Sequence, residues 1–141
     1  MSAEAEIRKL FEHWETAIRS KDLDGSLAHY APDVLAFDLI NPLQYTGSDA
    51  VRNRLESWFA SFEGPIGFET RDLSITAGDD VAFAHSLNHV DATTKDGRKL
   101  DMWWRATVCF RRVGGHWTVT HSHTSVPFDM ESGEASLDLE P

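Results

Sequence analysis

The first twenty residues carry apolar side chains at spacings of three and four, which place these side chains on one face of a helix. Ser2 is a candidate cap near the start of this helix, and the pattern ends around Ser20. The spacing therefore predicts a helix that packs one face against the rest of the protein. The residues of that face are Ile7, Leu10, Phe11, Trp14 and Ile18.

A second, shorter helix is expected after Asp22, which can cap it, and Pro32 bounds it. Its apolar stripe comprises Leu23, Leu27 and Tyr30. Tyr30 is a core residue that completes this stripe, or its hydroxyl is a hydrogen-bond donor to a ligand.

A β-type run over residues 34–38 and a loop lead to a third helix, which Ser48 is expected to cap. Gly64 and Pro65 are expected to end this helix. Its apolar stripe comprises Val51, Leu55, Trp58, Phe59 and Phe62.

The hydrophobic period then changes from that of a helix to that of a strand. Residues 66–77, 81–94, 98–113 and 116–127 read as four strands joined by Gly- and Asp-containing turns, which predicts an antiparallel meander. The second and third of these strands are long, so we expect strong coiling with bulges. Helices followed by a meander predict an α+β fold, in which three N-terminal helices pack on the concave face of a strongly curved antiparallel sheet. The conical hollow between the layers is the expected place for a small ligand.

Composition and charge limit the possible partners. A chain of 141 residues that is 41% hydrophobic predicts one packed domain. The formal net charge of −10 argues against nucleic acid and anionic membrane surfaces, which attract clustered positive charge. Residues 129–141 carry five acidic side chains and no Lys or Arg, so we expect a domain over residues 1–128 and a flexible acidic tail.

Several classes of site and location are disfavoured by what the chain contains. Cys109 is the single cysteine, so an internal disulfide cannot form, and we interpret this residue as a small core side chain. The charged N-terminus is unlike a signal peptide, and no apolar run is long enough to span a membrane. We therefore expect a soluble, cytoplasmic protein.

Two histidines follow the buried face of the last strand. Strict alternation puts Trp117, Val119, His121 and His123 on one face. Three interpretations remain open. The imidazoles are structural residues bonded to a neighbouring strand, pocket residues that orient or protonate a ligand, or metal ligands joined by Asp38 or His85.

Asp38 ends the apolar run of residues 34–37 and is a candidate general base at the edge of the hollow. The alternative is a strand-end aspartate that bonds its own backbone. Arg105 and Trp103 share one face of an aromatic strand, which points either into the hollow or outward to a subunit interface. His85 lies on one of the two faces of residues 81–94, and either face could point inward.

The segment from Tyr30 to Asp38, the helix-opening Gly47 and the closing strand, residues 115–128, resemble the SnoaL-like and ketosteroid-isomerase-like proteins. These belong to the nuclear-transport-factor-like superfamily of cone-shaped α+β folds. Asp38 lies nine residues before Gly47, which matches the position of the catalytic aspartate in ketosteroid isomerases. Asp38 is followed by Leu39 where that family has proline, and no second, oxyanion-hole aspartate can be placed.

The resemblance implies one of two functions. The first is an isomerase, dehydratase or cyclase acting on a small, apolar carbonyl compound, with Asp38 and His123 as catalytic residues. Its candidate substrate-binding residues are His121, Arg105, Tyr30, Trp103 and His85. The second is a non-catalytic ligand-binding or assembly domain. We expect no cofactor and no metal, and the aromatic residues on both faces of residues 98–113 predict a homodimer.

Overall fold

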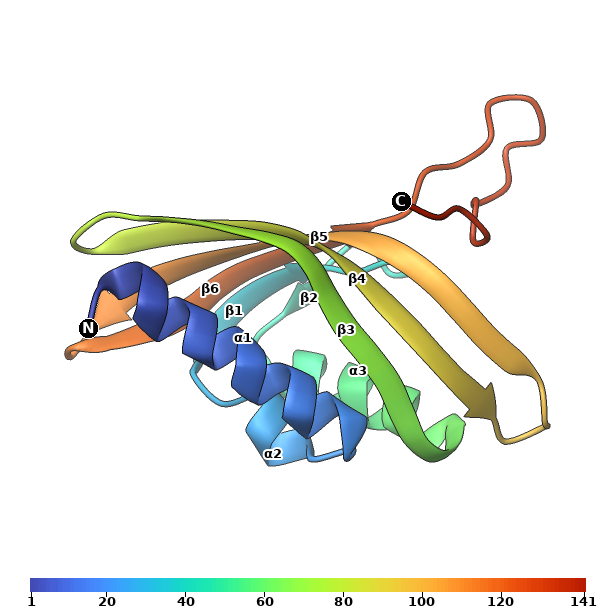
Figure 1. Cartoon of the computed structure of the whole chain (residues 1–141), viewed down its shortest axis with the longest axis horizontal. Helices are drawn as coiled ribbons and strands as arrows, with labels where there is room; N and C mark the ends of the chain where they lie inside the picture. The colour runs from blue at the N-terminus through green and yellow to red at the C-terminus, as the bar shows by residue number, and fades with distance from the viewer.

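The helices and strands follow the predicted order, with one additional short strand. The structure, a computed structural model, describes all 141 residues. Figure 1 shows the three helices on the concave side of a long, curved sheet, which confirms the α+β class. The elements are α1 (Ala3–Arg19), α2 (Leu23–Ser26), β1 (Tyr30–Phe37), β2 (Tyr45–Thr46), α3 (Ser48–Ala60), β3 (Phe62–Ala77), β4 (Val81–Thr94), β5 (Lys99–Val113) and β6 (His116–Ser125).

The six strands form one sheet in the order β2-β1-β6-β5-β4-β3. Strands β3 to β6 make the predicted antiparallel meander. Strand β1 is the exception, because it pairs with β6 in parallel. This pairing brings the end of β1, and with it Asp38, next to the second half of β6.

The bulges lie in other strands than expected. The pairing of the two long strands β4 and β5 runs without a shift from Val81–Arg111 to Thr93–Lys99. Shifts in register occur instead along β3 and between β5 and β6. An extra residue on one strand bends it and increases its twist, so these shifts give the sheet its curvature.

The predicted caps of the two N-terminal helices are confirmed. Ser2 accepts a hydrogen bond from the Ala5 amide at 3.1 Å, and Asp22 accepts one from the Gly25 amide at 3.0 Å. Ser48, the predicted cap of the third helix, is instead the first residue of α3, and Gly47 precedes it. The φ of Gly47 is +90°, an angle at which residues with a side chain are disfavoured.

Two other boundaries differ from the prediction. Helix α2 ends at Ser26, so Tyr30 begins β1 and is not part of a helical stripe. Helix α3 ends at Ala60, and Gly64 and Pro65 lie within β3. The strand starts early because Phe62, which is 1% exposed, pairs with Thr94 and is buried there.

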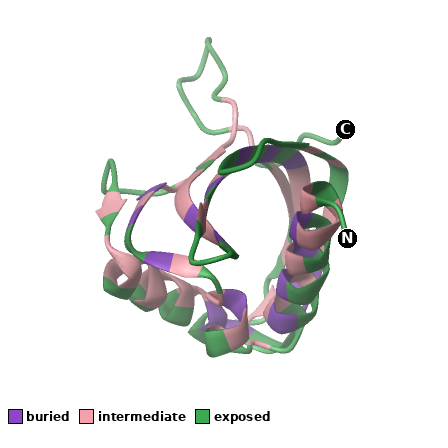
Figure 2. Cartoon of the chain, turned by 90° about the vertical axis from the view of Figure 1, so that its left-hand side faces the viewer, coloured by how far each residue is buried: buried purple, intermediate pink, exposed green.

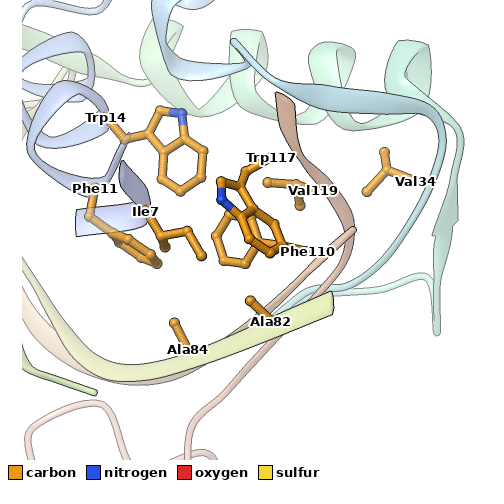
Figure 3. Close-up of a cluster of buried hydrophobic side chains, with 9 residues drawn as sticks. All are labelled: Ile7, Phe11, Trp14, Val34, Ala82, Ala84, Phe110, Trp117 and Val119. Atoms are coloured by element: carbon orange, nitrogen blue, oxygen red, sulfur yellow. The ribbon is translucent and has the colours of Figure 1, made fainter. Parts of the chain in front are cut away.

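The core consists of two clusters. In the first, Ile7, Phe11 and Trp14 of α1 pack on Phe110 and Trp117 of the sheet (Figure 3). The rings of Trp14 and Phe110 stack with centroids 6.1 Å apart. Figure 2 shows the buried stretches of α1 on the side of the helix that faces the sheet, as the spacing predicts. The second cluster lies where α3 meets the sheet and comprises Phe59, Phe62, Ile66, Phe68, Val90 and Ala92.

The last residues of the chain project from the body as a separate loop (Figure 1). A single bridge between Phe128 and Ala135 closes this loop, and Phe128 and Met130 are exposed. The domain boundary at residue 128 and the flexibility of the tail stay predictions. None of the helices combines the length and the apolar character that crossing a membrane requires.

Candidate functional site

A partly open cavity of about 230 Å³ lies between the helices and the concave face of the sheet. Hydrophobic residues make up 15 of the 21 that line it, and several of them belong to the core clusters or pack against them. The rings of Trp58 and Trp104 meet edge to face in its wall, with centroids 6.4 Å apart. Such a space suits a compact, largely apolar ligand.

Asp38 borders this cavity from the end of β1. One carboxylate oxygen accepts a hydrogen bond from the amide of Leu39 at 2.6 Å. The other accepts one from Nε of Arg54 at 3.2 Å, and the two side chains are 25% and 20% exposed. Asp38 therefore makes the predicted backbone contact and also faces the cavity.

Arg54 is a site residue that was not predicted from the sequence. It lies three residues after Val51 and four before Trp58, so it shares the inward face of α3 with the apolar stripe. A charged residue at that spacing was the available signal. The guanidinium group orients the carboxylate of Asp38 and balances its charge, so the ion pair adds no net charge to the cavity.

Tyr30 lines the same cavity from the start of β1. Desolvation by the surrounding residues and, to a smaller extent, the negative charge of Asp38 raise the pKa of Tyr30 from 10.0 to about 12. The phenol is therefore neutral at physiological pH and can donate a hydrogen bond. Its hydroxyl has no hydrogen-bond partner within the chain, so this donor is available to a ligand.

The predicted orientation of His121 and His123 is wrong. Phe110 pairs with Val119 but Cys109 pairs with His121, so Thr120 is an extra residue on β6. A bulge of this kind reverses the alternation of the residues that follow. Ser122 and Thr124 consequently line the cavity, while the two histidines lie on the outer face of the sheet.

His121 makes the contact expected of a structural histidine. Its Nδ1–H donates a hydrogen bond to the Leu35 carbonyl at 2.7 Å. The ring of Phe37 packs edge-on to both imidazoles, with centroid distances of 4.7 Å to His121 and 5.4 Å to His123. His123 also borders a second, more open hollow together with Asp38, at the end of the sheet next to the tail.

The comparisons with known proteins identify the fold family. The family model described as "SnoaL-like domain" matches residues 7–129. The chain belongs to the SnoaL-like family.

Solved structures agree with this assignment. A crystal structure of an NTF2-like protein of unknown function from Pseudomonas putida KT2440 is 42% identical, with a TM-score of 0.88, over 100% of this SnoaL-like chain and 99% of that one. A ketosteroid isomerase-like protein from Erwinia carotovora atroseptica is 21% identical, with a TM-score of 0.73, over 89% and 97% of the two chains. An uncharacterized protein with a cystatin-like fold from Caulobacter vibrioides is 16% identical, with a TM-score of 0.74, over 92% of each chain. No curated protein matches the sequence.

The remaining predicted binding residues of this SnoaL-like domain lie on the outer face of the sheet. Arg105 is exposed and donates from Nε to the Ser125 hydroxyl at 3.1 Å. Trp103 stacks on His89 with centroids 4.4 Å apart, and the guanidinium carbon of Arg71 lies 4.5 Å from the Trp103 ring. These residues do not line the cavity.

The alternation of inward and outward side chains along β4 and β5 explains why these residues lie outside the cavity. His85 of β4 pairs with Thr107 of β5 on the outer face and is exposed, while Ser86 and Asn88 point inward. Cys109 is half-buried on the outer face and is not the core residue that the sequence predicted. No group of three or more His, Cys, Asp or Glu side chains is placed to hold a metal ion.

Proposed function

We propose that this SnoaL-like protein binds a small, neutral carbonyl compound in the cavity and catalyses proton transfer at the carbon α to the carbonyl. The observation that supports this function is the meeting of a carboxylate, Asp38, and a neutral phenol, Tyr30, at one apolar cavity. The first group can accept a proton, and the second can stabilise the oxygen on which negative charge develops.

The residues have distinct roles in the proposed reaction. Asp38 removes the α-proton, the C–H electron pair moves into the new C=C bond of an enolate, and the Tyr30 hydroxyl donates to the enolate oxygen. With a β,γ-unsaturated ketone, Asp38 returns the proton to the γ-carbon of the dienolate and gives the conjugated isomer. With a β-hydroxy ketone, the protonated Asp38 gives its proton to the β-hydroxyl, which leaves as water and gives the enone. Arg54 holds Asp38 in place throughout.

The charge of the site favours a neutral substrate over an anionic one. Asp38 and Arg54 are the charged residues that line the cavity, and they pair with each other. A ligand carboxylate would have to compete with Asp38 for Arg54, and it would bring a second negative charge into a largely apolar space.

One observation favours the alternative function, a non-catalytic ligand-binding domain. Both oxygens of Asp38 already have a hydrogen-bond donor, as in a structural aspartate. Each carboxylate oxygen can accept more than one hydrogen bond, so these contacts still leave capacity for a proton. A measurement of proton transfer distinguishes the two functions.

The test is deuterium exchange at the α-carbon of one-ring and two-ring ketones in D₂O, followed by NMR. We expect exchange catalysed by the wild-type protein to fall by at least about 10²-fold in Asp38→Asn, because the amide cannot accept the proton. Ligand affinity should change little. Asp33→Asn is the matched control, since Asp33 is exposed on the same strand. Equal exchange by wild type and Asp38→Asn would exclude Asp38 as the base.

We also propose that the protein forms a homodimer through the outer face of the sheet. Large apolar side chains on this face are left partly uncovered by the chain, among them Phe83, which is 48% exposed, and Trp103. Phe83 is paired with Cys109 and lies in the same row as His121 and Leu35. This row is exposed to solvent in the monomer, and a second copy of the chain would cover it.

A further inference from the structure

The uncharged polar side chains of the cavity fall into two groups. The hydroxyls of three of them already donate to backbone carbonyls: Ser26 to Asp22, Tyr45 to Asn41 and Thr124 to Phe37. The other three, Tyr30, Ser122 and Asn88, have donors for which the chain provides no acceptor. Each of these three groups can donate a hydrogen bond, and the two hydroxyls can also accept one. A ligand with more than one acceptor would satisfy their free donors.

Asn88 is held in one orientation by its neighbour on the same face of β4. The hydroxyl of Ser86 donates to the carboxamide oxygen of Asn88 at 3.0 Å. Ser86 is only 7% exposed, so this hydrogen bond is shielded from solvent. With its oxygen engaged, Asn88 retains its NH₂ group as the donor that it can offer to a ligand in the cavity that it lines.

Asn88 is far from Asp38 along the wall of the cavity. Strand β4 is three strands away from β1 in the sheet, with β6 and β5 between them. At about 4.8 Å per strand this separation is about 14 Å along the curved surface. Asp38 and Tyr30 therefore serve one end of a ligand, and Asn88 can serve another.

We propose that Asn88 is a ligand-binding residue that recognises a second hydrogen-bond acceptor, remote from the carbonyl at Asp38. The inference rests on the proposed binding of a carbonyl compound and specifies its class. The ligand is a compact molecule of one or two rings with a carbonyl at one end and a further oxygen acceptor, such as a hydroxyl, at the other. The cavity volume of about 230 Å³ suits a molecule of this size.

The experiment compares 2-tetralone with its 6-hydroxy and 7-hydroxy derivatives. Dissociation constants are measured by NMR titration of the full-length protein and of Asn88→Leu, which replaces the amide with an apolar group of similar size. We expect the wild type to bind at least one hydroxylated ketone about fivefold more tightly than 2-tetralone, and Asn88→Leu to lose that preference. The affinity of each protein for 2-tetralone, which has no second acceptor, is the reference for its preference.

A second readout follows ligand binding in the wild-type protein. The side-chain NH₂ signal of Asn88, assigned by its absence in Asn88→Leu, should shift on addition of the preferred hydroxylated ketone and stay in place with 2-tetralone. Ser86→Ala, which removes only the group that orients the amide, should reduce the preference less than Asn88→Leu does. Asn53→Leu is the matched control, because Asn53 is exposed on α3.

The outcomes separate this inference from the proposed function. An unchanged preference in Asn88→Leu, or a stationary Asn88 signal, would overturn the role of Asn88, whatever happens to proton transfer. Failure of the wild type to bind any of the three ketones would overturn the ligand class. Loss of the preference in Asn88→Leu, combined with no effect of Asp38→Asn on deuterium exchange, would support the binding role and reject the catalytic one.

Discussion

Replacement of Tyr30 by Phe tests whether this phenol is the desolvated, neutral donor that the proposed function requires. The ring of Tyr30 packs edge to face on Trp14 with centroids 6.0 Å apart, and Phe can keep this contact. The hydroxyl has no hydrogen-bond partner in the chain, so its removal leaves no buried group unsatisfied. We expect the free energy of unfolding at pH 8 to change by less than about 1 kcal/mol.

The difference between the two proteins should grow in alkaline solution. The pKa of Tyr30 is about 12 in the folded protein against an ordinary value of 10.0, so the folded state holds this proton more tightly than the unfolded state. The resulting contribution to stability is fully present below pH 10 and is lost as the pH rises toward 12. The loss amounts to about 1.4 kcal/mol at pH 11, and it approaches about 2.7 kcal/mol when the shift is fully expressed.

Urea unfolding followed by tryptophan fluorescence at pH 8 and pH 11 measures this effect. All other titrating groups are shared by the two proteins and cancel in the difference. Between the two pH values, the wild type should lose about 1.4 kcal/mol more stability than Tyr30→Phe. A difference that is the same at both pH values would show that Tyr30 titrates normally and would refute the reasoning.

Three further perturbations test the core, the outer face and the tail. Phe110 is 2% exposed and packs against Phe11 and Trp14, so its replacement by Ala should lower the free energy of unfolding by about 3–5 kcal/mol. A loss below about 1 kcal/mol in urea unfolding would contradict this packing. Light scattering at micromolar concentration should show a dimer for the wild type and a folded monomer for Phe83→Glu; a monomeric wild type would reject the proposed homodimer. Removal of residues 129–141 should leave the unfolding free energy within about 0.5 kcal/mol, because the tail projects from the body, and a larger loss would show that it is part of the domain.

The parts of the fold that were predicted correctly depend on short-range signals. The periodicity of residues 7–18 and the Ser2 cap locate α1, and the hairpin turns locate the meander, because each signal acts within a few residues. Tyr30 shows the limit of this approach. Its spacing after Leu23 and Leu27 predicts that Tyr30 belongs to a helical stripe. Tyr30 is instead a strand residue, because it pairs with Val119 of β6, 89 positions further along the chain.

The candidate site was predicted in part. Asp38 and Tyr30 both line the cavity, while Arg54 was overlooked within an apolar helical stripe. The sequence alone does not decide which face of β4 points inward, because both of its sets of alternating residues include polar side chains. In the structure, Ala82, Ala84 and Ser86 are buried on the concave face of the sheet. By alternation, Asn88 lies on the same concave face, and His85 lies on the outer face.

The single residue that most changes the site is Thr120. Alternation along β6 assigns the two histidines to the buried face, and the assignment is correct up to Val119. One unpaired residue then reverses it, so that the cavity receives the hydroxyls of Ser122 and Thr124. A bulge is a property of two paired strands, and nothing in the sequence of β6 alone marks where β5 will skip a residue. The consequence is chemical: the titratable imidazoles lie outside the cavity, and the proposed proton transfer depends on Asp38, with Tyr30 as the neutral donor.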